Sequence, residues 1–406
     1  MNILAVKTLS KAQTASAERS PPGPILILTI ANGAGHTQAA KAIASAWQQL
    51  DTPIPARVID VSDFMSPLAR FTHVTAYLWL VKNAPAVWEK IDNYQKKQTQ
   101  TSPEWFYRRE CRKLFDLARE IQPSAIVATE VGCGEIAALI KRDLQLQIPL
   151  VAVNPNYEAD RAWVQPEVDL YCLVTNTMCQ GFVRNGARTD ETFAWGVPMQ
   201  PKFAVPSEYE RADERQKICK WLDLEPDTPL ILISGGGEGL GKIEEITKNL
   251  LQSEISASII VLAGNNKRVK GNCEKLKADS ASERRLRVVG WTNRVPELFR
   301  TADIMVSKLG NTFDEAMACG LPIVALPPPP GAERVQYETL EKLGVGRGVQ
   351  TVAEAVATVI GLLKNNATLE QLRKNAAKLG QNDAAAKVAL WLRERVETRY
   401  LTNAGA

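Results

Sequence analysis

Residues 25–47, ILILTIANGAGHTQAAKAIASAW, carry the pattern that decides the fold prediction. A short apolar run ends in the glycine turn NGAGH (32–36), after which small and apolar residues recur at helical spacing. A buried strand that passes directly into a helix is typical of a parallel sheet with helical crossovers. The same order returns over 229–242, where PLILIS meets a second glycine turn. We therefore predict an α/β protein with two doubly wound units.

Further apolar runs continue each unit, and a charged, proline-rich stretch over 196–229 lies between them. A chain of 406 residues is long enough for two domains. We predict a flexible tail over 1–23, a first domain over 24–203 and a second over 204–382. The last segment, 383–406, is predicted to be a helix that could cross back to the first domain.

The composition excludes several classes of protein. Charged residues make up 23% and hydrophobic residues 45% of the chain, as in ordinary globular proteins. Lys and Arg total 49 against 45 Asp and Glu, so the net charge of +4 gives no general signal for nucleic acid. The longest apolar runs are shorter than the roughly 20 residues that cross a bilayer. We expect neither a transmembrane span nor a secretory signal.

Cysteine and histidine usage limits the possible metal chemistry. The seven cysteines form no C-x-x-C pair, which argues against a disulfide framework or a zinc ribbon and favours the reducing cytosol. His36 and His73 are the two histidines, so a multi-histidine metal site is excluded. No Asp-x-Asp motif occurs, and we expect neither a metal nor a cofactor.

The two glycine turns could hold an anion, because backbone N–H groups and a helix N-terminus meet there. A dinucleotide fingerprint, as in an NAD-dependent dehydrogenase, would need glycine at Gln38, although Asp60 is suitably placed for a ribose. A P-loop nearly forms, but Ile243 replaces its Ser or Thr. A nucleotide-sugar enzyme would use one turn for the diphosphate and the other for the acceptor. The glycines could also merely permit tight turns.

The segment 25–47 resembles the opening of the monogalactosyldiacylglycerol synthase and processive diacylglycerol glucosyltransferase group in glycosyltransferase family 28. The resemblance continues in VVGWTNRVPELFRTADIMVSKLGNTFDEAMACGLPIV (288–324) and PPPPGAERVQ (327–336), and it covers roughly residues 24–350. It implies the GT-B fold, in which two Rossmann-like domains face each other across a cleft. The sugar nucleotide would lie mostly on the second domain.

The resemblance also implies roles for residues of the second domain. The turn 289–291 would meet the uracil through backbone groups, and Glu315, unless it is a solvated helix charge, would accept hydrogen bonds from the ribose hydroxyls. Helix N-termini, with Lys242 and Lys308, would stabilise the diphosphate. The residues predicted to bind the donor are Ser234, Gly235, Gly236, Gly237, Val289, Gly290, Trp291, Lys308, Asn311, Thr312, Glu315, Gly331, Glu333 and Gln336.

In the first domain the resemblance makes His36 the candidate catalytic base. A helix N-terminus favours a neutral imidazole, which suits that role; a helix-capping histidine is the alternative. The chain departs from the family pattern at Glu130, Asn156, Asp160 and Ala332. These changes leave the donor hexose and the acceptor open.

The region 64–107 contains nine of the chain's 26 aromatic residues, and 64–113 contains nine basic against four acidic residues. Aromatic and basic side chains together suit an anionic membrane surface. Nucleic acid is the rival partner but lacks a recognition motif, and a helical hairpin with core aromatics is the third interpretation. The residues predicted to meet acceptor or membrane are Gly33, Gly35, Tyr77, Trp79, Trp88, Asn156 and Tyr157.

Together these patterns predict a transferase that moves a hexose from a UDP-sugar to a lipid, with diacylglycerol expected, by inverting displacement. It would act as a peripheral protein at the cytosolic membrane face. There are two alternatives. One is a UDP-N-acetylglucosamine epimerase of the same fold, and the other is a degenerate, non-catalytic relative that binds nucleotide or lipid. The donor hexose, the number of sugars added and the oligomeric state are left open by these patterns.

Overall fold

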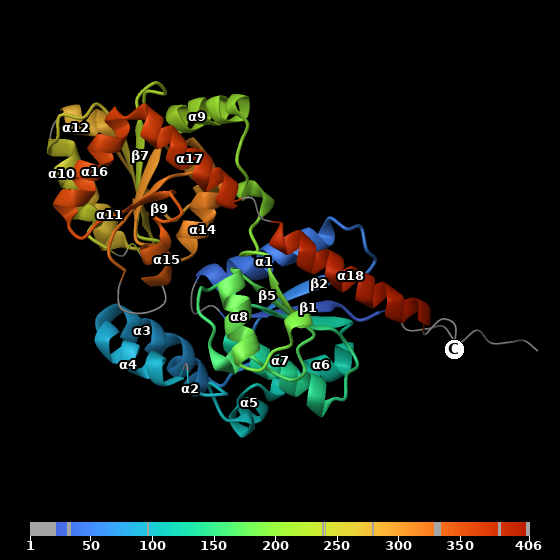
Figure 1. Cartoon of the computed structure of the whole chain (residues 1–406). Coiled ribbons are helices and arrows are strands. Elements are labelled where there is room, and N and C mark those ends of the chain that lie inside the picture. The colour runs from blue at the N-terminus through green and yellow to red at the C-terminus, as the bar shows by residue number, and fades with distance from the viewer. Residues whose placement is uncertain are drawn as a thin grey trace, which may run out of the picture.

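The computed structural model describes residues 22–30, 34–95, 97–237, 239, 241–277, 280–328, 334–380 and 383–402. Two six-stranded parallel sheets, each with helices on both faces, form two domains that lie one above the other (Figure 1). The predicted pair of doubly wound units is confirmed.

The sheet of the first domain has the strand order β2-β1-β3-β4-β5-β6. Its strands are β1 (Ile25–Thr29), β2 (Ala56–Asp60), β3 (Ala125–Ala128), β4 (Leu150–Val153), β5 (Leu170–Leu173) and β6 (Thr192–Ala194). Alternate residues of β1 are buried in two different hydrophobic cores, because successive side chains of a strand point to opposite faces of the sheet. Leu26 and Leu28 pack towards α6 (Arg112–Ile121), α7 (Val131–Asp143) and α8 (Asn176–Arg184). Ile25 and Ile27 pack towards α1 (Ala34–Gln48) and α18 (Ala384–Thr402).

The sheet of the second domain has the order β12-β11-β10-β7-β8-β9. Its strands are β7 (Leu230–Ser234), β8 (Ser258–Gly264), β9 (Leu286–Gly290), β10 (Ile304–Ser307), β11 (Ile323–Ala325) and β12 (Gly346–Gly348). One face is covered by α10 (Ile243–Gln252), α11 (Lys267–Glu274) and α16 (Val352–Lys364). The other is covered by α9 (Glu208–Leu222), α13 (Val295–Thr301), α14 (Asn311–Ala318) and α17 (Asn366–Gly380).

Each strand order reverses at one place, between β1 and β3 in the first sheet and between β7 and β10 in the second. We call these the first and second switch points. The helical connections of the two neighbouring strands run in opposite directions at a switch point. In open α/β sheets this leaves a crevice at the carboxyl ends of the strands, and ligands bind there. Gly35 and His36 at the start of α1, and the glycine turn that follows β7, therefore lie where the topology favours a site.

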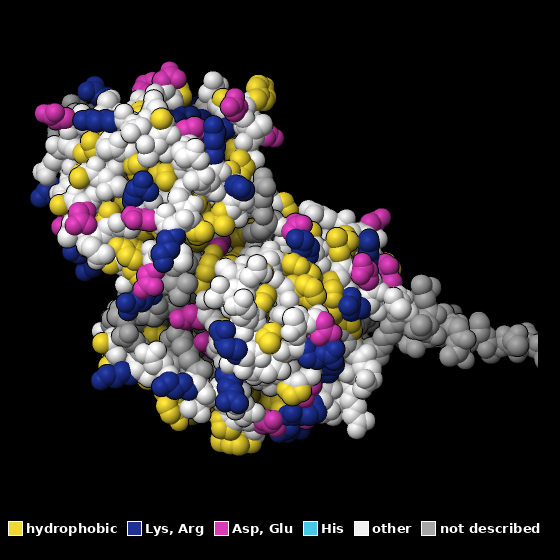
Figure 2. All heavy atoms as spheres, in the orientation of Figure 1, with side chains coloured by type: hydrophobic (Ala, Val, Ile, Leu, Met, Phe, Trp, Pro, Cys, Tyr) yellow, Lys and Arg dark blue, Asp and Glu magenta, His cyan; other side chains and the backbone are white. Residues whose placement is uncertain are grey.

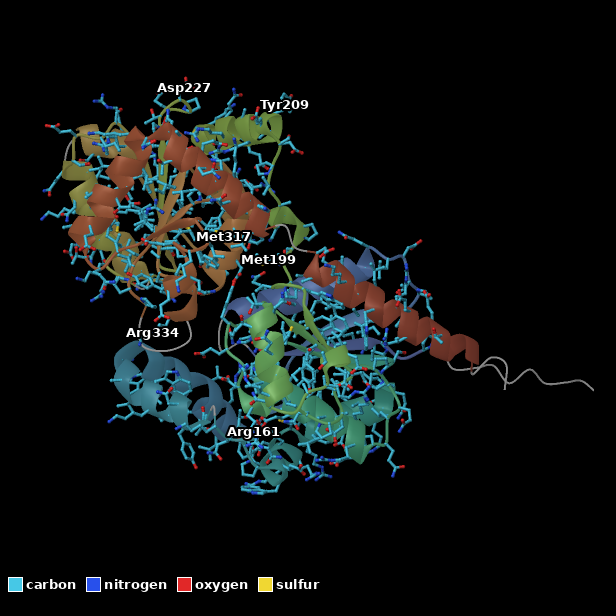
Figure 3. All side chains as sticks on the ribbon, viewed as in Figure 1. Arg161, Met199, Tyr209, Asp227, Met317 and Arg334 are labelled. Carbon is cyan, nitrogen blue, oxygen red and sulfur yellow. The ribbon has the colours of Figure 1, made fainter. Side chains whose placement is uncertain are left out.

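Two segments connect the domains. After β6 the chain continues through the linker 195–207, in which Phe203 packs edge-on against Phe299 of the second domain. Figure 3 shows Met199 of this linker beside Met317 of α14, and Met199 packs against the core that contains Met317. At the other end of the chain α18 crosses back and lies beside α1 (Figure 1), with Val388 and Leu392 buried in the first domain.

A helical excursion separates β2 from β3. It consists of α2 (Pro67–Arg70), α3 (Ala76–Asn83), α4 (Pro85–Gln95) and α5 (Glu104–Glu110), and α3 lies below α15 (Arg334–Thr339) of the second domain (Figure 1). Over the part of the chain that the structure describes, no helix combines the length and apolar character needed to cross a membrane.

Candidate functional site

His36 lies at the first switch point, in the first turn of α1. Its Nδ1 is 2.6 Å from the backbone carbonyl oxygen of Thr129, the residue that follows β3. A carbonyl oxygen can only accept, so Nδ1 carries the proton of this hydrogen bond. In the neutral ring Nε2 then has the free lone pair, as a general base requires.

The next residue, Glu130, has a structural function. It is the N-cap of α7, and its Oε2 accepts a hydrogen bond of 3.1 Å from the backbone N–H of Cys133. The side chain is 8% exposed. The glutamate that departs from the family pattern is therefore bound to a helix N-terminus beside the His36 contact.

The second switch point presents the turn after β7. Gly236 has a φ of +70°, and a Cβ placed there would lie 3.9 Å from Cε of Lys308. A Cβ on Gly237 would lie 3.5 Å from Cζ3 of Trp291. The turn is thus bordered by a lysine from the end of β10 and a largely exposed tryptophan from the end of β9. Lys242, by contrast, is exposed and 4.0 Å from Glu245 of its own helix.

Glu315 lies in α14, one turn after the helix start. Burial, together with the neighbouring carboxyl of Asp314, raises the pKa of Glu315 to about 8, while Lys202 of the linker lowers it. No described residue donates a hydrogen bond to its carboxyl group. A ligand with vicinal hydroxyls would supply the missing donors.

Gln336 holds the start of α14 in place. Its Oε1 accepts from the backbone N–H of Gly310 at 2.8 Å, and its Nε2 donates to the carbonyl oxygen of Gly310 at 3.3 Å. Gly310 has a φ of +97° and precedes Asn311 and Thr312 at the helix N-terminus. Gln336 is 4% exposed, so its amide is buried where it bonds the backbone at the start of α14. Its direct contact with a donor stays a prediction.

The residues after β4 lie at the junction between the domains. Asn156 donates its backbone N–H to Oδ1 of Asn154 at 2.9 Å. Tyr157 turns towards the second domain, where its hydroxyl donates to Oδ1 of Asp314 at 2.5 Å. Their predicted contact with an acceptor stays a prediction.

Several predicted site residues cannot be placed. Gly33, Gly331 and Glu333, with the departure Ala332, lie outside the described residues, and only the backbone is described for Tyr77 and Asn311. The remaining predicted positions lie at the two switch points or on the excursion: Gly35 and His36; Ser234, Gly235, Gly236 and Gly237; Val289, Gly290, Trp291 and Lys308; Trp79 and Trp88.

The excursion exposes several large apolar side chains. Phe71 is 57%, Trp79 59%, Tyr94 67% and Trp105 63% exposed, whereas Tyr107 is buried. Exposed basic residues occur in the same stretch of the chain: Arg70, Lys90, Lys97 and Arg109, followed by Arg112 and Lys113 at the start of α6. Figure 2 shows yellow and dark blue side chains together at the lower edge of the molecule, over the region of α4 and α5. The interpretation as core residues is therefore wrong for these four exposed aromatics, whereas Tyr107 belongs to the core of the first domain and Phe64 and Phe106 pack against it, partly buried.

The described residues offer no site for a metal ion. Within the described ranges there is no group of three or more His, Cys, Asp or Glu residues that could hold a metal ion. Positive charge at the second switch point comes instead from Lys308 and backbone N–H groups.

Comparison with known proteins agrees with this geometry. Residues 36–199 match the family model described as monogalactosyldiacylglycerol (MGDG) synthase, and residues 242–365 match glycosyl transferases group 1. The structure of Acinetobacter baumannii MurG superposes with a TM-score of 0.61 at 16% identity, over 92% of this chain and all of that one. The chain is a glycosyltransferase with the GT-B fold. The resemblance and fold predicted from the sequence are confirmed.

Two further comparisons concern the type of reaction. The processive diacylglycerol β-glucosyltransferase of Bacillus subtilis is 26% identical over 364 residues, which cover 87% of this chain and 91% of the relative. The UDP-GlcNAc 2-epimerase of Neisseria meningitidis, solved bound to UDP-GlcNAc, superposes with a TM-score of 0.58 at 14% identity, over 91% of this chain and 99% of that one. The fold alone therefore does not separate transfer from epimerisation.

Sequence reasoning missed two residues that contact the candidate site residues. Thr129 acts through its backbone, and the only signal for it was its place at the end of the strand AIVAT. Asp314 precedes Glu315, and nothing in the sequence pairs it with Tyr157.

Proposed function

We propose that this glycosyltransferase moves a hexose from a UDP-sugar to the hydroxyl of diacylglycerol at the cytosolic face of an anionic membrane. The observation that supports this proposal is that the two switch points carry different groups, a candidate base at one and a candidate diphosphate site at the other. A histidine with a free Nε2 lies at the first, and a glycine turn bordered by Lys308 lies at the second. The name of the Bacillus relative makes glucose the first hexose to test.

The second domain would bind the donor. Backbone N–H groups of residues 235–237, with Lys308, would face the diphosphate and stabilise the charge that develops as UDP leaves. Glu315 would accept hydrogen bonds from the two ribose hydroxyls, and the backbone of 289–291 would meet the uracil. The UDP-sugar bound by the Neisseria enzyme, which shares the fold, supports this class of donor.

The first domain would activate the acceptor. Nε2 of His36 takes the proton of the lipid hydroxyl while that oxygen attacks the anomeric carbon. The bond from the anomeric carbon to the diphosphate breaks in the same step, UDP leaves with the bonding electrons, and the sugar is inverted. The Nδ1–H hydrogen bond to Thr129 keeps Nε2 available for the proton.

The excursion would bring the first domain to the lipid. Its exposed aromatic side chains can enter the interface of a bilayer, and the surrounding lysines and arginines are attracted to anionic headgroups. Both the MGDG synthase match over 36–199 and the name of the Bacillus relative support a lipid acceptor.

Incubation with UDP-glucose, UDP-galactose and UDP-N-acetylglucosamine in turn, with and without vesicles of diacylglycerol and anionic phospholipid, tests the proposal. Vesicle-dependent release of UDP, with a glycosylated lipid as product, is expected for one donor. An epimerase would convert UDP-N-acetylglucosamine without vesicles and without release of UDP. That outcome, or no reaction with any donor, would contradict the proposal.

A second measurement tests the membrane surface. Phe71→Ala with Trp79→Ala should weaken sedimentation with anionic vesicles by roughly tenfold, because two interfacial aromatics are removed. Tyr209→Ala is the matched control, since Tyr209 is 83% exposed on α9 of the second domain. Equal binding by the double variant and the control would locate the membrane contact elsewhere.

A further inference from the structure

The loop after β4 is shaped to reach the second domain. Asn154 is 1% exposed and forms the base of this loop. Its Oδ1 accepts from the backbone N–H of Asn156 at 2.9 Å, and its Nδ2 donates to the carbonyl oxygen of Glu158 at 2.8 Å. A side chain that bonds its own backbone in this way fixes a tight turn. Tyr157 lies between the two residues whose backbone groups bond to Asn154.

Tyr157 contacts the donor helix in two ways. Its ring meets Phe313 edge-on, with centroids 6.3 Å apart and an interplanar angle of 75°. Its hydroxyl donates to Oδ1 of Asp314 at 2.5 Å. Burial and the nearby carboxyl of Asp314 raise the pKa of Tyr157 well above its usual value, so the hydroxyl keeps its proton and remains a donor.

Asp314 connects this contact to both walls of the donor site. It precedes Glu315 in α14, and its Oδ2 lies 3.5 Å from Nε2 of Gln336. Gln336 in turn bonds both backbone groups of Gly310, at the N-terminus of α14. It belongs to α15, the helix that follows the loop predicted to meet the donor sugar. One hydrogen-bonded chain thus runs from the first domain to the start of α14 and to α15.

We propose that Tyr157 is a positioning residue that couples the donor-loaded second domain to the acceptor-binding first domain through its hydrogen bond to Asp314. The inference rests on the proposed donor site. In this role Tyr157 acts through α14, which carries Glu315, and needs no contact of its own with either substrate. A donor bound at α14 restricts the motion of this helix. Through the Tyr157 contact it also restricts the turn 154–158, which lies on the same sheet edge as His36. Loss of the hydroxyl should therefore lower turnover more than donor affinity.

Tyr157→Phe tests this role, because it keeps the ring and removes only the hydroxyl. Turnover with the vesicle acceptor should fall five- to twentyfold, while the dissociation constant for UDP changes less than twofold. Tyr171→Phe is the matched control: Tyr171 is buried in the first domain, where its hydroxyl is 3.0 Å from both the backbone N and the carbonyl oxygen of Gln165. This variant should lose thermal stability without the change in turnover.

A double-variant cycle separates coupling from a general loss of packing. Asp314→Ala alone should lower turnover as Tyr157→Phe does, and the combined variant should be no worse than the more affected single variant. Asp314→Asn, which keeps an acceptor oxygen, should restore part of the loss. Multiplied effects in the combined variant would overturn the inference.

Hydrogen exchange gives a readout that does not need the acceptor. UDP should slow amide exchange over 154–158 in the wild-type protein and have no such effect in Tyr157→Phe. If UDP protects this turn equally in both proteins, or in neither, the coupling is absent although the donor site stands. A wild-type protein that neither binds UDP nor releases it from UDP-sugars would overturn the proposed function, and the inference with it.

Discussion

Nδ1 of His36 and the backbone carbonyl oxygen of Thr129 lie 2.6 Å apart across the first switch point. The two residues are far apart in sequence, but the parallel pairing of β1 with β3 brings the carboxyl ends of their strands together. The partner of the imidazole is a backbone group of the sheet edge, so the ring orientation depends on the fold and not on another side chain. Substitution of Thr129 should accordingly leave the hydrogen bond in place.

His36→Ala should lower turnover by about 10²- to 10⁴-fold, the usual contribution of a general base. The affinity for UDP should change less than twofold, because the proposed donor site lies on the other domain. Initial rates with vesicles, combined with a calorimetric UDP titration, would check both points. A variant that keeps a tenth or more of the wild-type turnover would show that His36 is not the base.

Binding of UDP should release a proton near neutral pH. Burial is the main cause that raises the pKa of Glu315 to about 8, so the carboxyl is mostly protonated at pH 7. Accepting two ribose hydroxyls favours the ionised form, and UDP affinity should therefore rise as the pH increases from 6.5 towards 8, then level off. Calorimetry in buffers of different ionisation enthalpy would count the protons released. Glu315→Gln should bind UDP more weakly and lose this dependence; proton-neutral binding by the wild-type protein would contradict the assignment.

Gly264→Ala should disrupt the donor turn. Gly264 has a φ of +57°, and a Cβ at this position would lie 2.2 Å from the carbonyl oxygen of Gly237, far inside contact distance. Because that carbonyl also accepts from the backbone N–H of Asn265 at 2.8 Å, the turn would have to move. We expect UDP to bind at least tenfold more weakly. Gly271→Ala is the control, since a Cβ there would meet no atom within 4 Å and it lies in α11, where alanine favours the helix. Unchanged UDP binding by Gly264→Ala would refute the placement of the diphosphate.

The sequence predicted both switch-point turns because a strand, a glycine turn and a helix follow one another locally, and the parallel topology then determines where they lie. It did not predict the Tyr157–Asp314 contact, since that bond depends on how two domains are placed and neither residue type signals a partner. Aromatic enrichment on the excursion was visible in the sequence. The sequence did not show that Trp79 would be exposed and Tyr107 buried, because the exposure of each side chain depends on tertiary packing.

A buried carboxyl anchors the end of the excursion to the first domain. Glu135 of α7 is 4% exposed, and its Oε1 accepts from the backbone N–H of Thr101 at 2.6 Å. Its Oε2 accepts from the hydroxyl of Tyr107 at 2.7 Å and from the hydroxyl of Thr101. Burial raises the pKa of Glu135 to about 7 from 4.5, against the opposing effect of these hydrogen bonds.

This carboxyl should make folding stability fall as the pH rises. Between pH 4.5 and 7 the unfolded chain loses the proton first, so the free energy of unfolding contributed by Glu135 decreases over this window, by up to about 3 kcal/mol, and stays constant above it. Glu135→Gln should remove that slope, whereas Glu120→Gln, an exposed position on α6, should keep it. Urea unfolding at pH 5, 6, 7 and 8 would measure the difference. Parallel curves for wild type and Glu135→Gln would show that the carboxyl does not titrate in this range, because a group with the same charge in both states cannot give a pH-dependent difference in stability.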